Sequence, residues 1–274
     1  MKKQVWLNVF LLMVIVLLIG VLIYLKPSMD VTDQQQGLFK TAIQDVKYIR
    51  IERQGQPAMV LVKAKQWVLI KPALAPVNHE QVRHLLTIIN EPIQHQLVRK
   101  KDDLKIFKLD AERIKLTIND EKITFGMINP VTHNRYVLKN TNIYTIKEIV
   151  YGALGSSVTH LLQHHLLPKS MRVTQIEAPS MFYQTKQARD SWSILEATNI
   201  ADYSADETIL GIVSLTIQKS ESNNEQNNKV PELITTTLVF DILAIKPTLI
   251  LGRADLKVKY TIDKMAAKQV FIVE

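Results

Sequence analysis

The segment His79-Glu80-Gln81-Val82-Arg83-His84 contains two histidines and a carboxylate, the residue types of a zinc-dependent hydrolase. The zinc motif H-E-x-x-H places its histidines four residues apart, on one face of a helix. Here they are five residues apart, and this spacing turns the second imidazole by about 140° around a helix of 3.6 residues per turn. One helix cannot direct both imidazoles at one ion, so we expect His79 and Glu80 only to begin a helix, where Glu80 favours the first turn.

Three more histidines, His160, His164 and His165, lie among leucines in the middle of the chain. His160 and His164 have the spacing that would place them on one helix face. No carboxylate lies near them in the sequence and the chain has no cysteine, so nothing completes a metal site. We expect these histidines to be polar positions of a bridging helix.

The other residues that could do chemistry also favour structural roles. Asp102, Asp103 and Asp110 could supply acid–base carboxylates, but their segment is typical of a polar turn. Trp67 and Trp192 could stack a ligand, but core packing is the favoured interpretation. The patterns G-x-S-x-G, S-x-x-K and the P-loop do not occur. The sequence therefore predicts no catalytic residue, no metal ligand and no cofactor-binding residue.

Residues 5–25 form an apolar run of 21 positions without a charge. At about 1.5 Å per residue this run spans the ~30 Å hydrocarbon layer of a bilayer. A cleaved signal peptide is the alternative, but its apolar core should be about 7–15 residues long and end in a small-residue site, which is missing here. We predict a retained transmembrane helix at residues 5–25. Lys2 and Lys3 precede it, which places residues 1–4 in the cytosol.

Composition indicates the compartment. The absence of cysteine suits an oxidising compartment and excludes a disulfide framework. We expect a single-pass protein of the bacterial inner membrane with a periplasmic C-terminal domain. Beyond Lys2 and Lys3, the 32 basic and 26 acidic residues give a net charge of +6. This charge predicts a mildly basic solvated surface, with attraction to anionic headgroups as the alternative, and nucleic acid is not expected as a partner.

Landmark residues recur along the chain and predict an internal duplication. Ile51 precedes Trp67 by sixteen residues, and Ile176 precedes Trp192 by the same distance. The offset between the halves is 125 residues for these pairs, 126 for Gly126 and Gly252, and 124 for Tyr136 and Tyr260.

The predicted fold class is α+β, with two duplicated, mainly antiparallel β-sheet units that each carry one covering helix. The first unit, residues 45–146, has predicted strands at 46–53, 58–63, 66–70, 114–118, 122–125, 135–138 and 143–146, and a helix capped by Asn78. The second unit, residues 171–274, has a strand at 192–194, a helix through Ile209 and Val213 after the capping box Ser204–Glu207, and strands at 233–242, 248–251, 257–262 and 269–273. Residues 26–44 are expected to be a stalk, 147–170 a connecting helix, and 220–229 a flexible hairpin loop.

Short motifs along most of the chain resemble the bacterial family called domain of unknown function 4340. They are Trp6-Leu7-Asn8, Ile49-Arg50-Ile51-Glu52-Arg53, Trp67-Val68-Leu69 with Pro72, Phe107-Lys108-Leu109-Asp110, Phe125-Gly126, Arg135-Tyr136-Val137 and Leu166-Leu167-Pro168. Family members often have Gly where Lys108 stands. The resemblance implies a single-pass inner-membrane protein with a periplasmic repeat domain. Some relatives are associated with ABC-type transporters, including gliding-motility systems, and the family supplies no catalytic residue.

We therefore expect a non-enzymatic, membrane-anchored periplasmic protein that binds a protein partner. An accessory role in an ABC-type transporter or envelope complex is what the resemblance implies. One alternative is a module that binds lipid, glycan or another small ligand in the groove between the two units. A hydrolase of a new type is the other. The sequence does not predict the oligomeric state.

Overall fold

The computed structural model describes residues 37–98, 100, 102–110, 113–148, 151–155, 157–219 and 235–272. The predicted transmembrane helix at 5–25, residues 1–4, most of the stalk at 26–44 and the loop at 220–229 lie outside these ranges. Within them, no helix is both long and apolar enough to cross a membrane. Residues Gly37–Glu274 form one compact unit.

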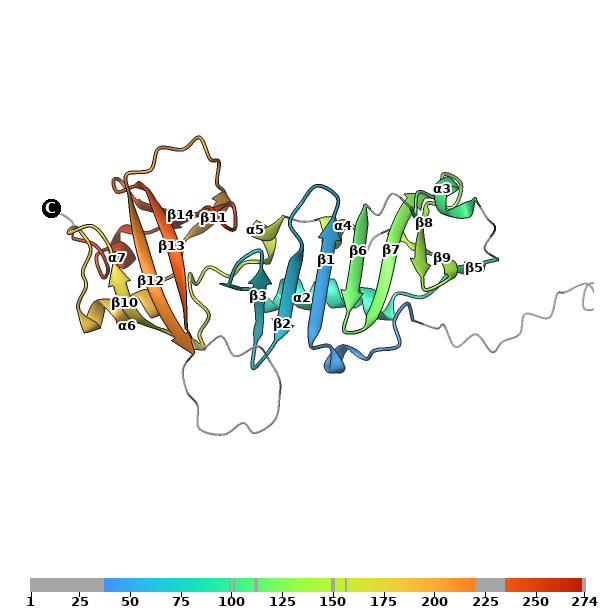
Figure 1. Cartoon of the computed structure of the whole chain (residues 1–274), viewed down its shortest axis with the longest axis horizontal. Helices are drawn as coiled ribbons and strands as arrows, with labels where there is room; N and C mark the ends of the chain where they lie inside the picture. Colours follow the sequence, from blue (N-terminus) through green and yellow to red (C-terminus); the bar gives the residue numbers. More distant parts are fainter. Residues whose placement is uncertain are drawn as a thin grey trace, which may run out of the picture. The chain divides into compact units, whose positions relative to one another are not determined.

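This unit is α+β and contains two antiparallel sheets, as expected for the fold class. The first sheet has nine strands in the order β4-β3-β2-β1-β6-β7-β8-β9-β5 (Figure 1). Its elements are η1 (Ile43–Asp45), β1 (Tyr48–Arg53), β2 (Met59–Lys63), β3 (Trp67–Lys71), β4 (Ala75–Pro76), α2 (His79–Leu86), η2 (Thr87–Asn90), β5 (His95–Leu97), α3 (Asp103–Ile106), β6 (Ile114–Ile118), β7 (Glu121–Ile128), β8 (Asn134–Lys139) and β9 (Asn142–Lys147).

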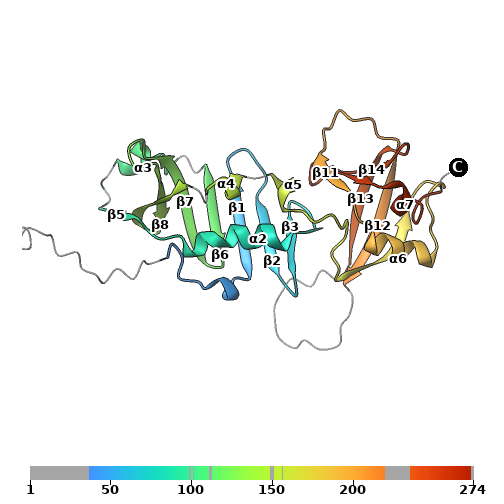
Figure 2. The same ribbon diagram turned by 180° about the vertical axis from the view of Figure 1, so that it is seen from behind.

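Period-2 alternation explains why the first sheet has one buried face. Ile49 and Ile51 of β1 pair with Ile118 and Leu116 of β6, and all four side chains are buried. Helix α2 covers this face and crosses β6, β1 and β2 in Figure 2. It begins as predicted, because the Asn78 side chain accepts hydrogen bonds from the backbone N–H groups of residues 80 and 81.

The second sheet has six strands in the order β10-β12-β13-β14-β15-β11. Its elements are β10 (Met171–Glu177), α6 (Lys186–Ile194), β11 (Asn199–Asp202), β12 (Gly211–Lys219), β13 (Thr235–Ala244), β14 (Leu249–Arg253), β15 (Val258–Ile262) and α7 (Lys264–Ala267). Trp192 of α6 is fully buried against the sheet, with its ring centroid 6.1 Å from that of Phe240 in β13. Thr185 caps α6 by accepting a hydrogen bond from the Ala188 N–H group.

The two sheets share one order of strand connection. In the first, β1 pairs with β6, a meander runs through β9, and β5 closes on β9. In the second, β10 pairs with β12, a meander runs through β15, and β11 closes on β15. A helix, α2 or α6, lies between the first strand and the closing strand of each set. Strands β2, β3 and β4 have no counterpart in the second sheet.

This correspondence differs from the predicted alignment. Ile51 and Ile176 do lie in matching strands, β1 and β10. Trp67, however, lies in β3, whereas Trp192 lies in α6 and not in a strand. Gly126 and Gly252 lie in β7 and β14, and Tyr136 and Tyr260 lie in β8 and β15, so neither pair is equivalent. The nearly constant offset between the halves therefore matched residues that are not equivalent in the two sheets, apart from Ile51 and Ile176.

The predicted helix after Ser204 is wrong. The Ser204 N–H group does donate to the Glu207 carboxylate, as in a capping box, but a turn follows and strand β12 begins at Gly211. Val213, Leu215 and Ile217 are buried, and the residues between them point to the other face. This period-2 pattern, and the pairing of β12 along nearly its whole length with β13, outweighs the local helix signal.

Two other segments differ from expectation. The described part of residues 147–170 contains two short helices, α4 (Tyr151–Gly155) and α5 (Val158–Leu161), and then an extended segment, in place of one connecting helix. In place of a strand at 269–273, Phe271 forms one bridge with Phe182, shortly after α7. Lys108, where the resemblance implies that Gly is common, has a φ of +53°, in the left-handed region that favours Gly.

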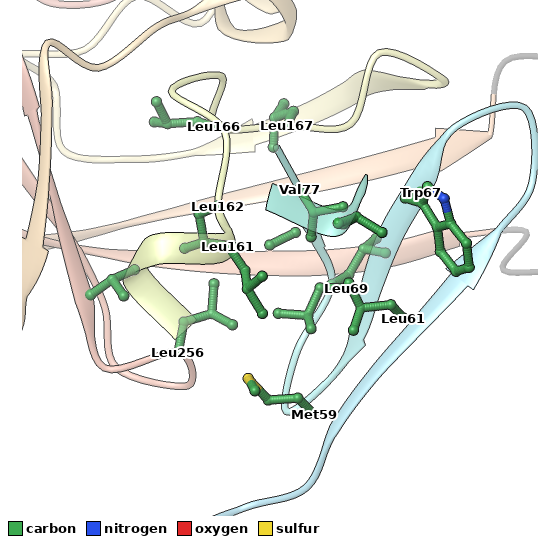
Figure 3. Packing of buried hydrophobic residues seen from close by; sticks show 14 of the residues in the cluster. Met59, Leu61, Trp67, Leu69, Val77, Leu161, Leu162, Leu166, Leu167 and Leu256 are labelled. Carbon is green, nitrogen blue, oxygen red and sulfur yellow. The ribbon is translucent and has the colours of Figure 1, made fainter. Parts of the chain in front are cut away.

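The extended segment joins the two sheets by backbone hydrogen bonds. On one side the Gln163 N–H group donates to the carbonyl oxygen of Pro76 in β4, at 3.1 Å. On the other side Ala197 N–H donates to His164 O. Apolar side chains from both sheets fill this junction, as Figure 3 shows for Met59, Leu161 and Leu256. Arg253 of β14 is fully buried here and donates through Nη2 to the Leu74 carbonyl oxygen, at 3.1 Å.

Candidate interaction surface

The described histidines do not converge on one site. His160 Nδ1 lies 3.2 Å from Ser157 Oγ, and His164 Nδ1 lies 2.7 Å from Ala197 O. His165 Nε2 lies 2.8 Å from a Glu196 carboxylate oxygen. Because α5 ends at Leu161, His160 and His164 do not share a helix face as predicted. Across the residues described here, no group of three or more His, Asp and Glu side chains could hold a metal ion.

The remaining candidates have structural surroundings. His79 and Glu80 lie in the first turn of α2, where Glu80 pairs with Arg83. Asp102 and Asp103 lie at the start of the short helix α3, where a polar turn was expected. The Asp103 carboxylate accepts a hydrogen bond from the Lys100 N–H group at 2.6 Å. Trp67 and Trp192 are buried in the core, as the packing interpretation predicted.

Three buried polar atoms in the core between the second sheet and α6 have no hydrogen-bond partner among the described residues: Arg253 Nη1, Trp192 Nε1 and the Tyr260 hydroxyl. All three residues have ring or cation–π contacts with Phe240. Burial raises the pKa of Tyr260 to about 12, so its hydroxyl stays protonated at neutral pH. An arginine, a tryptophan and a protonated tyrosine supply no general base.

A half-open pocket of about 290 Å³ lies at the far end of the second sheet, beside α7. Leu249, Ala267 and Phe271 form its buried apolar floor, and Lys246 and Lys264 lie on its rim. Its volume is at the lower limit of small-molecule sites. The pocket is lined by the β13–β14 connection, by α7 and by Phe271, all in the second unit. It does not lie in the groove between the two units that the ligand-binding alternative requires.

The outer face of the second sheet, opposite the buried face, is organised by residues 203–210, the crossing segment. Tyr203 donates its hydroxyl to the Asp241 carboxylate at 2.9 Å, and its ring lies over Gly252, where an added Cβ would meet ring carbon Cε1 at 3.0 Å. Burial, together with the hydrogen bond to Asp241, raises the pKa of Tyr203. Glu207 accepts two hydrogen bonds from Lys259, each 2.9 Å long. These contacts fix the crossing segment over β13, β14 and β15.

Where the crossing segment joins β12, four aliphatic side chains form the exposed aliphatic cluster. They are Ile209, Leu210, Ile212 and Val239, which are 50%, 56%, 51% and 45% exposed. Ile212 pairs with Asp241, so Ile212 and Val239 share the outer face as diagonal neighbours, and Leu210 lies two residues before Ile212. The outward positions farther along β12 and β13 are Ser214, Thr216, Gln218, Thr235 and Thr237, none of them charged. Beside the Asp241–Tyr203 pair, the outer face of these two strands therefore offers aliphatic and uncharged polar side chains.

The exposed aliphatic cluster was not predicted, because the capping box at Ser204 assigned Ile209, Leu210 and Ile212 to a helix. The alternation in residues 235–241, Thr-Thr-Thr-Leu-Val-Phe-Asp, was the available signal. It assigns Leu238 and Phe240 to the core and leaves Val239 as an aliphatic residue among outward polar ones.

The fold and this surface define an α+β protein of two antiparallel sheets with an exposed aliphatic cluster and, among the residues placed in the structure, no convergent polar centre. A protein-family model described as Domain of unknown function (DUF4340) matches residues 67–264. The match covers more than half of the chain, and the chain belongs to this family, which confirms the resemblance. No curated protein and no solved structure matches the chain.

Proposed function

We propose that this chain is a non-enzymatic, membrane-anchored envelope protein that binds a protein partner through the outer face of its second sheet. The exposed aliphatic cluster is the observation that carries the proposal. Monomeric proteins expose single aliphatic side chains routinely, but adjacent exposed aliphatics are typical of interaction sites. The neighbouring Ser and Thr side chains provide an uncharged polar rim, and the Asp241 carboxylate beside Ile212 is already hydrogen-bonded to Tyr203.

The anchor in this proposal is the apolar run at residues 5–25, with residues 37–274 in the periplasm of a bacterium. An accessory role in an ABC-type transporter or another envelope complex is part of the same proposal. The shared strand connection of the two sheets supports an origin by duplication, with strands β2, β3 and β4 added to the first unit.

A labelling experiment tests the anchor and its orientation. The chain has no cysteine, so Gln175→Cys, at an exposed position of β10, introduces a single thiol. In intact spheroplasts, a membrane-impermeant maleimide should label this thiol without lysis. Labelling only after permeabilisation would place the domain in the cytosol.

Affinity capture of the full-length protein from gently solubilised membranes tests the partner. The wild type should retain a partner in a fixed ratio, and Ile212→Ser with Val239→Ser should lose it, because one half-buried aliphatic contact contributes about 1–2 kcal/mol to an interface. Ile194→Ser is the matched control, since Ile194 is 67% exposed on α6. Recovery of the wild type alone, also after gentle crosslinking, would refute the proposal.

A further inference from the structure

The chain enters the described unit at one end of the first sheet and is fixed there. The Glu121 carboxylate accepts the N–H groups of Lys40 and Thr41, at 3.0 Å and 2.8 Å. Asn119 Oδ1 accepts the N–H groups of Lys47 and Tyr48, at 3.0 Å and 3.1 Å. Asn119 lies in the β6–β7 turn and Glu121 is the first residue of β7, at the same end of the sheet as the start of β1 (Figure 1).

Lysines gather at this end. The Lys63 N–H group donates to the Lys47 carbonyl oxygen at 2.9 Å, which brings the β2–β3 turn beside the entering chain. We call residues 40–47, 63–66 and 119–122 the basic end. It carries five lysines (Lys40, Lys47, Lys63, Lys65 and Lys122) and three acids (Asp45, Asp120 and Glu121). The charge of Glu121 is already balanced by Lys139 of β8, at 2.6 Å.

Chain length limits how far the basic end can lie from the apolar run. That run ends at residue 25, twelve residues before Gly37, and a fully extended chain spans at most about 3.6 Å per residue, or about 40 Å here. If the run spans a bilayer, as the proposed function holds, the basic end is the part of the first sheet nearest to it in the chain. We propose that the basic end faces the bilayer and binds anionic phospholipid headgroups.

The electrostatics set the expected effect. Each lysine close to an anionic leaflet raises the ratio of lipid-bound to lifted states about fivefold. This attraction extends only about 8 Å from the leaflet at physiological salt. Binding should therefore need anionic lipid, require near contact, and weaken in high salt. Neutralising two lysines of the basic end should lower the ratio of lipid-bound to lifted states by about 25-fold.

The test uses the full-length chain in nanodiscs of phosphatidylcholine, with or without phosphatidylglycerol. Gln66→Cys labels the basic end, and Gln56→Cys labels a turn at the opposite end of the same sheet; both positions are exposed. Each thiol carries a fluorophore, and a quencher is attached to lipid headgroups. Phosphatidylglycerol should increase quenching at position 66 and leave position 56 unchanged, and high salt should reverse the increase. Equal quenching in the two discs, or an equal increase at both positions, would overturn the proposal.

Lys47→Gln with Lys122→Gln should abolish the increase at position 66. The charge-matched control, Lys71→Gln with Arg113→Gln, removes two exposed basic residues near the opposite end and should retain it. An increase lost equally in both pairs would mean that net charge, and not the basic end, attracts lipid. Flotation with pure phosphatidylcholine vesicles tests the anchor alone. If the protein does not float, the anchor proposal fails. The labelled protein is then mixed with vesicles, and quenching at position 66 that depends on phosphatidylglycerol still shows whether the basic end binds lipid.

Discussion

Glu121→Gln probes the contact that holds the entering chain on the first sheet. The Glu121 side chain is 20% exposed. Burial alone would raise its pKa, but hydrogen bonds from Lys139, from the Lys40 and Thr41 N–H groups and from the Thr41 hydroxyl outweigh burial and lower the pKa from 4.5 to about 2. This difference corresponds to about 3 kcal/mol of stabilisation by the ionised carboxylate.

The pH dependence of this stabilisation follows from the lowered pKa of Glu121. Because the folded state holds the carboxylate ionised, the stabilisation is complete above the unfolded-state pKa of 4.5 and is lost as pH falls toward about 2. Glu121→Gln mimics the protonated side chain. The variant should therefore be less stable than the wild type by about 3 kcal/mol at pH 7, and by only about 1 kcal/mol at pH 3.

Urea unfolding of the full-length protein in detergent, followed by tryptophan fluorescence, measures these differences. Glu52→Gln is the control, because Glu52 is 38% exposed and paired with Arg50, and such surface pairs contribute at most about 1 kcal/mol. A loss below 1 kcal/mol for Glu121→Gln at pH 7 would refute the reasoning. So would a difference from the wild type that does not shrink between pH 7 and pH 3.

Three further substitutions test the fold by the same unfolding assay. Gly126→Ala should lower the free energy of unfolding by about 1–3 kcal/mol, because the new Cβ would collide with the Phe107 carbonyl oxygen. Gly152→Ala is the control: its Cβ meets no atom within 4 Å, and the free energy of unfolding should not fall. Asn119→Ala should cost about 2–3 kcal/mol, since two backbone N–H groups and one carbonyl lose their partner; an effect below 0.5 kcal/mol would contradict the anchoring role of this side chain. Lys108→Gly should stabilise by about 0.5–1 kcal/mol by relieving a left-handed backbone, and a destabilised variant would show that the lysine side chain matters more.

Much of the first sheet could be predicted from the sequence, because its helix cap and its strand alternation are local patterns. Asn78 predicted the start of α2, and alternating residues predicted β6 at its observed bounds, Ile114–Ile118. Each of these patterns lies within a few residues, where propensity and periodicity act directly. The very short strands β4 and β5 give no such pattern and depend on the partners that they pair with.

The second sheet was harder to predict, because a local helix signal competed with the pairing of strands. Ser204–Glu207 looks like a helix start, and its hydrogen bond does form, but pairing with β13 decides the state of the residues after Gly211. The true helix, α6, is capped by Thr185, and its Trp192 had been matched to a strand tryptophan. The exposed aliphatic cluster depends on which face of β12 points outward, and a helical assignment hides that face.

The docking role of the second sheet is tested most directly by photocrosslinking in intact cells. A photoreactive amino acid at position 212, in the exposed aliphatic cluster, should give one crosslinked product of defined mass. The same amino acid at position 194, which is also exposed but lies on α6, should give none. No product at position 212, or the same products at both positions, would contradict the account.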